Sequence, residues 1–225
     1  MLCQASITLF LKNNKDSRDC SSYRPISLTN CDVKVFSKVI ALQLETILPH
    51  FISGDQTGFI QGRQSYFNLR WLFNIINTES STPSPEAVIS FDAEKKLDRV
   101  EWNRLFHTFS RFGFGPNFIQ LIKLIYTDPT TSVYTNDISS GYFPLHRGTK
   151  QGDPVSPLLF VLAIEPLAIA LRCNNSALQC KGTSRGDLTH TVSLYAEDLL
   201  LYVTNPITST PKILSLAGIW KHIWI

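Results

Sequence analysis

The sequence predicts an α+β domain in which an antiparallel sheet is backed by helices. Helical and strand-like segments interleave along the chain, and the last two strand-like segments, 191–196 and 199–204, flank a short turn. They should therefore form a local hairpin, whose antiparallel pairing disfavours a purely parallel, doubly wound sheet. With 225 residues, 44% of them hydrophobic, the chain can build a substantial core in one large domain or two small ones.

Apolar side chains recur at helical intervals in several segments. The first, 32–48, is followed by Pro49, where we expect the helix to stop. The same spacing predicts further helices over residues 64–78, 100–112 and 116–126. The segment 157–171 is apolar almost throughout but contains Glu165 and a proline, so it predicts a buried helix that is too short to cross a bilayer. Ser156 is its expected N-cap.

Strand-like segments surround a Ser/Pro-rich linker and the helices. "AVISFD", residues 87–92, is short, apolar and rich in β-branched side chains, which predicts a buried strand with Asp92 at its end. Two more strands are expected over 131–136 and 141–145.

Charge and cysteine content narrow the function classes. Charged residues make up 17% of the chain, below the roughly 25% that is usual, so some apolar surface should need a partner. Residues 1–75 carry eight Lys/Arg against five Asp/Glu, which fits an anionic partner. The five cysteines form no C-x-x-C pair, which argues against zinc and suits a reducing compartment. Without a signal-peptide pattern or a membrane span, we expect an intracellular protein with no membrane partner.

Three carboxylates could form a metal site. Asp92 ends a predicted strand, and Glu197 and Asp198 lie side by side at the predicted hairpin tip. If strand and hairpin are neighbours in one sheet, the three carboxylates converge, and Mg²⁺ prefers such oxygen ligands. The alternative is that Asp92 caps its strand and the pair lies in an ordinary solvated turn.

Five sequence blocks, in order, resemble those of a known polymerase family. "YAED" (195–198) is similar to a Y-x-D-D box, "FDAEKKLDRVEW" (91–102) to a D-A-E-K-A-F-D-x-V motif, and "GTKQGDPVSPLLF" (148–160) to a G-x-x-Q-G-x-P-x-S-P-L-L-F motif. "SSYRPISLTNCDVKVFSKVIALQLE" and "DQTGFIQGRQS" resemble the upstream finger segments. Together these blocks resemble the reverse transcriptase domain of non-LTR retrotransposons, the long interspersed element class.

The resemblance implies a right-hand polymerase. Residues 1–85 would form a fingers-like region, 86–205 a palm-like region with a ferredoxin-like sheet, and 206–225 a divergent tail. The reaction would be attack of a primer 3′-hydroxyl on a deoxynucleoside triphosphate, templated by RNA. Two Mg²⁺ ions, or Mn²⁺ in their place, would be the cofactors.

The resemblance also implies roles for single residues. Asp92, Glu197 and Asp198 take the positions of the catalytic, metal-binding aspartates. Nucleotide-binding positions fall on Arg63, Leu97, Gln151 and Gly152. Primer or template positions fall on Arg24, Lys150 and Tyr195. The residues alone leave plainer alternatives open: a surface arginine at 63, an ordinary turn around Gln151, solvated charges at 24 and 150, and a core tyrosine at 195.

Four departures from the family pattern point towards lost activity. Glu197 replaces the first of the paired aspartates and extends the carboxylate by one methylene, about 1.5 Å, although Mg²⁺ demands near-ideal geometry. Leu97 replaces the aromatic side chain that blocks a ribose 2′-hydroxyl. Asp153 adds a negative charge where a triphosphate is expected to lie. Finally, the resemblance fades after residue 205, so we expect the thumb, and the endonuclease domain that lies upstream in relatives, to be missing.

Three hypotheses follow from these patterns. The chain is a working RNA-directed DNA polymerase fragment, a catalytically inactive remnant that binds nucleic acid, or a translated relic that folds incompletely. Primer extension, salt-dependent nucleic-acid binding and cooperative unfolding separate the three.

Overall fold

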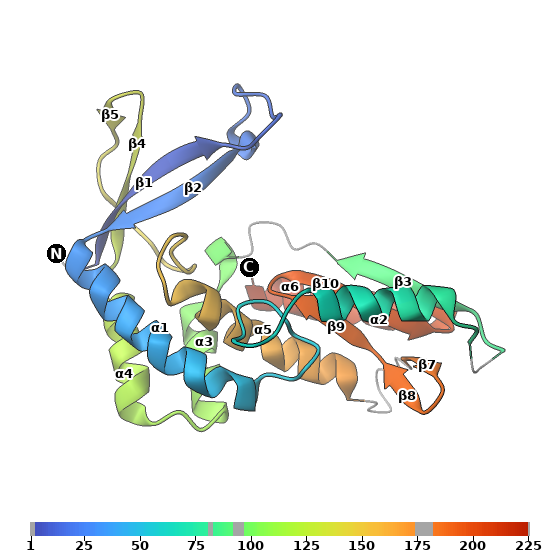
Figure 1. Cartoon of the computed structure of the whole chain (residues 1–225). Coiled ribbons are helices and arrows are strands. Elements are labelled where there is room, and N and C mark those ends of the chain that lie inside the picture. Colours follow the sequence, from blue (N-terminus) through green and yellow to red (C-terminus); the bar gives the residue numbers. More distant parts are fainter. Residues whose placement is uncertain (1–2, 81–82, 92–96, 174–181, 225) are drawn as a thin grey trace. The chain divides into compact units, whose positions relative to one another are not determined.

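The computed structural model in Figure 1 describes residues 3–80, 83–91, 97–173 and 182–224. This part of the chain contains six α-helices and three β-sheets, which confirms the α+β class. The chain divides into two units, each built from two separated segments. Unit 1 consists of Met1–Leu44 and Leu97–Leu159, and unit 2 of Glu45–Lys96 and Phe160–Ile225. Both units cross the expected boundary at residue 85, and the fingers-like and palm-like assignment stays a prediction.

Unit 1 contains a five-stranded sheet. Its strands are β1 (Gln4–Leu11), β2 (Tyr23–Thr29), β4 (Thr130–Thr135), β5 (Ile138–Ser139) and β6 (Phe143–Pro144). β1 pairs antiparallel with β2 from Ala5 to Leu11 and parallel with β4 on its other edge (Figure 1). The expected strands near 131–136 and 141–145 are confirmed, whereas β1 and β2 were not anticipated.

Helices α3 (Trp102–Arg111) and α4 (Pro116–Ile125) lie where helical spacing predicts them. Gly113 ends α3 with φ +82°, a conformation that glycine adopts without a Cβ clash. Its N–H donates to Ser110 O, and the next N–H, of Phe114, donates to Phe109 O. The rings of Phe109 and Phe114 lie 5.3 Å apart, so polar and apolar contacts together fix this turn.

Helix α1 spans Cys31–Phe51, so the expected stop at Pro49 is wrong. Proline removes one donor and one main-chain bond, and near the end of a long helix this loss is small enough for the last residues to stay helical.

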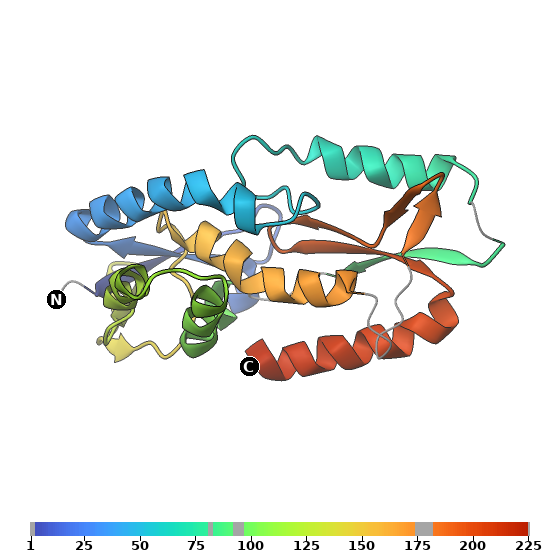
Figure 2. The same cartoon turned by 90° about the horizontal axis from the view of Figure 1, so that it is seen from below.

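Unit 2 contains a three-stranded antiparallel sheet in the order β3-β10-β9. The strands are β3 (Glu86–Phe91), β9 (Val192–Tyr195) and β10 (Asp198–Thr204). Helices α2 (Tyr66–Asn77) and α6 (Pro206–Trp224) lie on opposite sides of this sheet (Figure 2). The helix α2 was expected, whereas α6 was not anticipated. A short hairpin of β7 (Thr183–Arg185) and β8 (Leu188–His190) completes the described part of the unit.

Helix α5 (Ser156–Arg172) is the expected buried helix: Leu159, Val161, Leu162 and Ala168 are fully buried. The N-cap expected at Ser156 is wrong, because Ser156 is already the first helical residue. A side chain from the preceding turn supplies the bond instead: Asp153 Oδ1 accepts from Val155 N at 3.0 Å. In the described ranges, no helix is long and apolar enough to cross a membrane.

Candidate functional site

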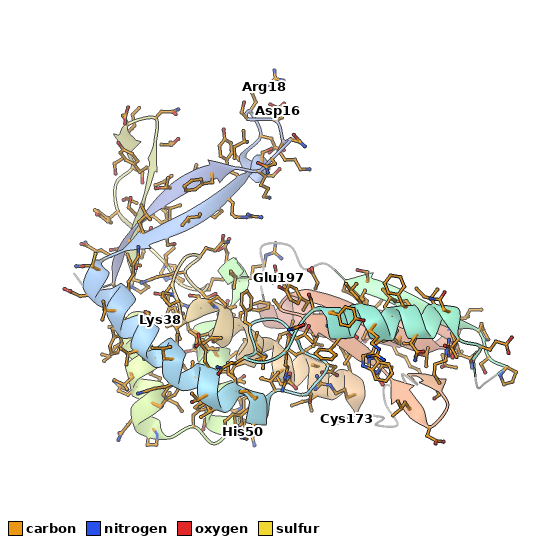
Figure 3. All side chains as sticks on the ribbon, in the orientation of Figure 1. Asp16, Arg18, Lys38, His50, Cys173 and Glu197 are labelled. Atoms are coloured by element: carbon orange, nitrogen blue, oxygen red, sulfur yellow. The ribbon has the colours of Figure 1, made fainter. Side chains whose placement is uncertain are left out.

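The two adjacent carboxylates lie on the β9–β10 hairpin of unit 2. β9 ends at Tyr195 and β10 begins at Asp198, so the turn itself consists of Ala196 and Glu197, which is labelled in Figure 3. The hairpin is confirmed, but Asp198 is a strand residue paired with Tyr195 rather than a second turn residue. Asp198 is exposed and Glu197 is half-buried.

The third expected carboxylate, Asp92, lies outside the described residues. The residue before it, Phe91, pairs with Leu199, which directly follows Asp198. Carboxylate oxygens of Glu197 and Asp198 are the donors that a hard divalent cation prefers, so the chemistry of this pair fits Mg²⁺. Within the described ranges, no group of three or more His, Cys, Asp or Glu side chains could hold a metal ion.

The turn has an unusual main-chain conformation. Ala196 is 1% exposed and has φ +53°, a region that costs an L-residue about 1–2 kcal/mol. A buried glutamine from a distant loop, Gln56, bonds to both main-chain groups of Ala196. Sequence reasoning missed Gln56. Its only signal was its place in "DQTGFIQGRQS", one of the five family-like blocks.

Two predicted ligands in unit 2 differ in exposure. Tyr195 is 50% exposed, so the interpretation as a core tyrosine is wrong. Arg63 is half-buried, and its guanidinium donates to main-chain carbonyls at the end of α1 and in the following loop. The accepting residues are Pro49, Ile52, Ser53 and Gln56. Burial lowers the pKa of Arg63 from its usual value. These bonds explain how the loop after α1 is held, and binding of a triphosphate by Arg63 stays a prediction.

In unit 1, the loop 148–152 is attached to the segment that begins at Leu97. Gly148 N donates to Val100 O at 2.8 Å, and Thr149 N donates to Leu97 O at 2.6 Å. A Cβ at Gly148, whose φ is +92°, would lie 2.8 Å from Asp98 O, so the close approach requires glycine. Main-chain hydrogen bonds therefore join the loop to the segment of the half-buried Leu97 within unit 1.

The predicted nucleotide-binding residues of this loop lie against β2. Gln151 O accepts from Ser27 N at 2.8 Å, and the Gln151 side chain donates to Asp98 Oδ1 at 3.4 Å. Gly152 has φ +96°, and a Cβ there would lie 3.2 Å from the Ile26 side chain.

Lys150 and Asp153 are buried, contrary to two expectations. Lys150 is 5% exposed, so the alternative of a solvated charge is wrong, and burial lowers the pKa of its ammonium group. Asp153 is 3% exposed, and its carboxylate accepts from Ser37 Oγ at 3.0 Å as well as from Val155 N. The structure therefore gives no support to a repulsive charge facing the triphosphate: Asp153 holds the start of α5. Arg24, on β2, is exposed.

The structure thus places the predicted residues in two sets. Unit 1 holds Arg24, Leu97, Lys150, Gln151 and Gly152, and unit 2 holds Arg63, Tyr195, Glu197 and Asp198. Each set is positioned by bonds within its own unit.

Solved structures with a similar fold include telomerases. The apo telomerase of Candida tropicalis, truncated from its C-terminal domain, matches 96% of this chain and 46% of its own with a TM-score of 0.59 at 12% identity. Telomerase of the same species in complex with a fragment of telomeric RNA gives the same TM-score and identity, over 96% of this chain and 38% of its own. At this identity the likeness concerns the fold.

Curated relatives come from transposable elements. The transposon TX1 149 kDa protein of Xenopus laevis is 31% identical over 199 residues, which is 88% of this chain and 15% of that protein. The Pol polyprotein of the type-1 retrotransposable element R2 of Popillia japonica is 23% identical over 95% of this chain and 29% of its own length. The chain therefore spans less than a third of these relatives, which are non-LTR retrotransposon proteins, as the sequence blocks predict.

A family model, described as reverse transcriptase (RNA-dependent DNA polymerase), matches residues 11–220. This match includes the Glu197–Asp198 hairpin, the loop at Gln151 and most of α6, so it covers both units and nearly the whole sequence. The chain belongs to the reverse transcriptase family.

Proposed function

We propose that this chain is part of an RNA-directed DNA polymerase that adds deoxynucleotides to a primer 3′-hydroxyl. The observation that carries the proposal is the family match over residues 11–220, which includes two adjacent carboxylates on a hairpin paired with β3. Because the chain spans less than a third of the curated relatives that it matches, the activity of the whole protein is part of this proposal.

The finer architecture belongs to the same proposal. The antiparallel sheet β3-β10-β9, with α2 and α6 on its two sides, would be the palm sheet of a right-hand polymerase. Residues 1–85 would supply the fingers. The three carboxylates would then lie at one end of the palm sheet.

Reverse transcriptases use divalent metal ions, and Glu197, Asp198 and Asp92 would hold them here. Bound Mg²⁺ would neutralise the charge that develops on the transferred phosphoryl group. The exposed carboxylate of Asp198, and that of Glu197 in the turn, are the described donors for this purpose.

On the nucleotide side, Gln151 and Gly152 would contact the incoming nucleotide and Leu97 its sugar. Their loop is fixed to β2 and to the segment at Leu97, which would hold it in place without substrate. Arg63 would contact the triphosphate only by giving up part of its carbonyl bonds.

The partners would be an RNA template and a DNA primer. One similar solved structure is a telomerase with a telomeric RNA fragment, which supports RNA as the template. Tyr195, half exposed beside the carboxylates, would contact the primer end, and the exposed Arg24 would contact a phosphate backbone. Lys150 would have to leave its buried position to reach nucleic acid.

Primer extension tests the proposal. The chain, a primed RNA template and deoxynucleotides are incubated with Mg²⁺ or Mn²⁺. Extension should occur, and Asp198→Asn should reduce it at least a hundredfold. Asp187→Asn is the matched control, because Asp187 is an exposed carboxylate at the β7–β8 turn of the same unit. Extension that survives Asp198→Asn would assign the chemistry elsewhere.

Glu197 favours a second candidate function, binding of nucleic acid without catalysis. The longer side chain displaces the carboxylate, and a misplacement of about 1 Å can cost on the order of 10²-fold in rate. If the chain extends no primer and Glu197→Asp does not restore extension, this second function takes precedence. It requires RNA or DNA binding that weakens steeply with salt, because phosphate contacts release counterions.

The leucine at position 97 predicts how well the enzyme distinguishes deoxynucleotides from ribonucleotides. A leucine fills less space than the aromatic side chain usual at this position, so discrimination against ribonucleotides should be weak. Leu97→Phe should raise the ratio of deoxynucleotide to ribonucleotide incorporation about tenfold, measured by competitive extension.

A further inference from the structure

The amide of Gln56 is fully buried and makes three hydrogen bonds to main chain. Its Oε1 accepts from Ala196 N and from Gly58 N, both at 2.9 Å, and its Nε2 donates to Ala196 O at 3.1 Å. One side chain therefore bonds both main-chain groups of the residue before Glu197. A side-chain amide has the same donor and acceptor as a peptide group, so it can pair with a turn that has no strand beside it.

The main chain next to Gln56 pairs with the hairpin as a short parallel bridge. Leu194 N donates to Asp55 O, and Thr57 N donates to Leu194 O, both at 2.9 Å. The side chain of Asn68, on α2, also donates to Leu194 O at 2.7 Å. We call residues 55–58 the tip clamp, since they contact the hairpin from residue 194 to residue 196.

Gly58 allows the tip clamp to approach this closely. A Cβ built on Gly58 would lie 2.1 Å from Ala196 N and 2.8 Å from Ala196 Cα, distances that no side chain can occupy. Gly54, four residues earlier in the same loop, has open space around its Cβ position. Contact with the turn therefore requires a glycine at position 58 but not at position 54, so Gly54 can serve as a control.

The tip clamp is fixed in turn to α5. Asp55 accepts two bonds from Arg172, at 2.5 and 2.6 Å, and Arg172 also pairs with the fully buried Glu165 at 2.7 Å. Glu165 additionally accepts from Ser53 N at 3.3 Å. The loop is thus held to a buried helix on one side and to the hairpin tip on the other.

We propose that Gln56 is a positioning residue for the metal-binding carboxylates: through Ala196 it fixes the main chain from which Glu197 and Asp198 project. This inference rests on the proposed polymerase function for its consequence, but the clamp itself does not. Ala196 is held at a positive φ that an alanine does not prefer, and the two bonds from Gln56 hold it there. Without them the turn relaxes, and both carboxylates move with it.

Gln56→Met tests the clamp, because methionine has nearly the same length and can make none of the three hydrogen bonds of the amide. Gln61→Met is the control, since Gln61 is exposed in the same loop. Hydrogen exchange of single amides, followed by NMR without metal, is the deciding measurement. We expect the Ala196 amide to exchange at least tenfold faster in Gln56→Met and unchanged in Gln61→Met. Unchanged exchange at Ala196 in Gln56→Met would overturn the proposal.

Gln56→Glu decides the matter if Gln56→Met does not fold. At a pH where this carboxyl is ionised, it keeps an acceptor for the amides of Gly58 and Ala196 and loses the donor to Ala196 O, so protection of Ala196 should be intermediate. Wild-type protection would overturn the proposal. Gly58→Ala should also speed exchange at Ala196, whereas Gly54→Ala should not, and equal exchange in both would contradict the clamp.

Two activity measurements connect the clamp to the carboxylates. In primer extension, Gln56→Glu should lower kcat about tenfold and leave KM for the nucleotide within twofold. If the variant only folded less well, the measured rate would fall in proportion to the fraction of folded protein. Equal kcat per folded molecule would contradict the positioning role. If the wild-type chain extends no primer, the proposed function fails while exchange at Ala196 still decides the clamp.

Discussion

The loop 148–152 of unit 1 and the β9–β10 hairpin of unit 2 carry polar residues of similar appearance in the sequence, but they hold them in opposite ways. In the loop, Lys150 and nearby Asp153 are buried, and Asp153 bonds to Ser37 and to the start of α5. In the hairpin, Asp198 and Tyr195 are exposed, and the buried polar group is Gln56 from a distant loop. A charged residue in a motif can therefore be buried and hold the main chain in one unit and be exposed at the surface in the other.

The largest effect should come from the ion pairs that anchor the tip clamp. Arg172→Met leaves the buried carboxylate of Glu165 without its positively charged partner, which costs about 3–5 kcal/mol of unfolding free energy. Urea unfolding measures this loss. Arg70→Met, an exposed arginine on α2, should change stability by no more than about 0.5 kcal/mol. Equal losses of unfolding free energy in the two variants would mean that the ion pairs of Arg172 do not stabilise the tip clamp.

A second experiment concerns the loop of unit 1. Gly148→Ala places a Cβ 2.8 Å from Asp98 O at a positive φ, and we expect a loss of about 2–4 kcal/mol. Gly113→Ala has a similar φ and open space, so it should lose only about 1–2 kcal/mol. Thermal unfolding of the two variants isolates the contact, and equal losses would show that the loop can move away from Asp98.

A third experiment tests whether Arg63 holds the loop after α1 or binds the triphosphate. Arg63→Lys keeps the charge but cannot reach four carbonyls, so the protein should lose about 1–3 kcal/mol of stability. KM for the nucleotide should stay within twofold if Arg63 is scaffold. The reverse result, an unchanged melting temperature with a much higher KM, would assign Arg63 to the triphosphate.

The smallest effect concerns pH and Asp153. Burial raises the pKa of Asp153, so the folded protein retains this proton at pH values where the unfolded chain has released it. Its contribution to stability is therefore greatest below the usual pKa of 3.8 and decreases as the pH rises through the raised value. Asp153→Asn should be more stable than the wild type at pH 7, and the difference should shrink towards pH 4. Urea titrations at several pH values measure it, with the exposed Asp187→Asn expected to follow the wild type.

Local patterns in the sequence predicted those elements that local physics determines. Helices α2 to α5 have clear apolar periodicity or a helix-compatible proline, and the β9–β10 hairpin is joined by a two-residue turn. Strands β1 and β2 were missed, and one reason is that β1, between β2 and β4 in the sheet, pairs on one edge with β4, which is more than a hundred residues away in the sequence. The helix α6 was missed because Pro206 and Pro211 obscure its periodicity.

The candidate site was predictable as a set of residue types but not as a set of environments. Family-like motifs indicated Asp198 and Gln151, yet nothing in the spacing distinguishes an exposed aspartate from a buried one such as Asp153. Burial depends on packing against distant segments, here Ser37 for Asp153 and the hairpin for Gln56. For the same reason, the residues next to Gln56 in the sequence do not indicate its contact with the hairpin.

The pairing of β3 with β10 has a consequence during synthesis on the ribosome. β3 ends at Phe91, whereas its partner strand runs from Asp198 to Thr204. The ribosome must therefore synthesise more than a hundred further residues before β3 can pair with β10. Until then it exposes an unpaired strand edge, a surface on which nascent chains associate. An open reading frame that stops before residue 198 would leave this edge uncovered for good, so interrupted copies of the sequence should aggregate or be degraded rather than persist as folded competitors of the intact chain.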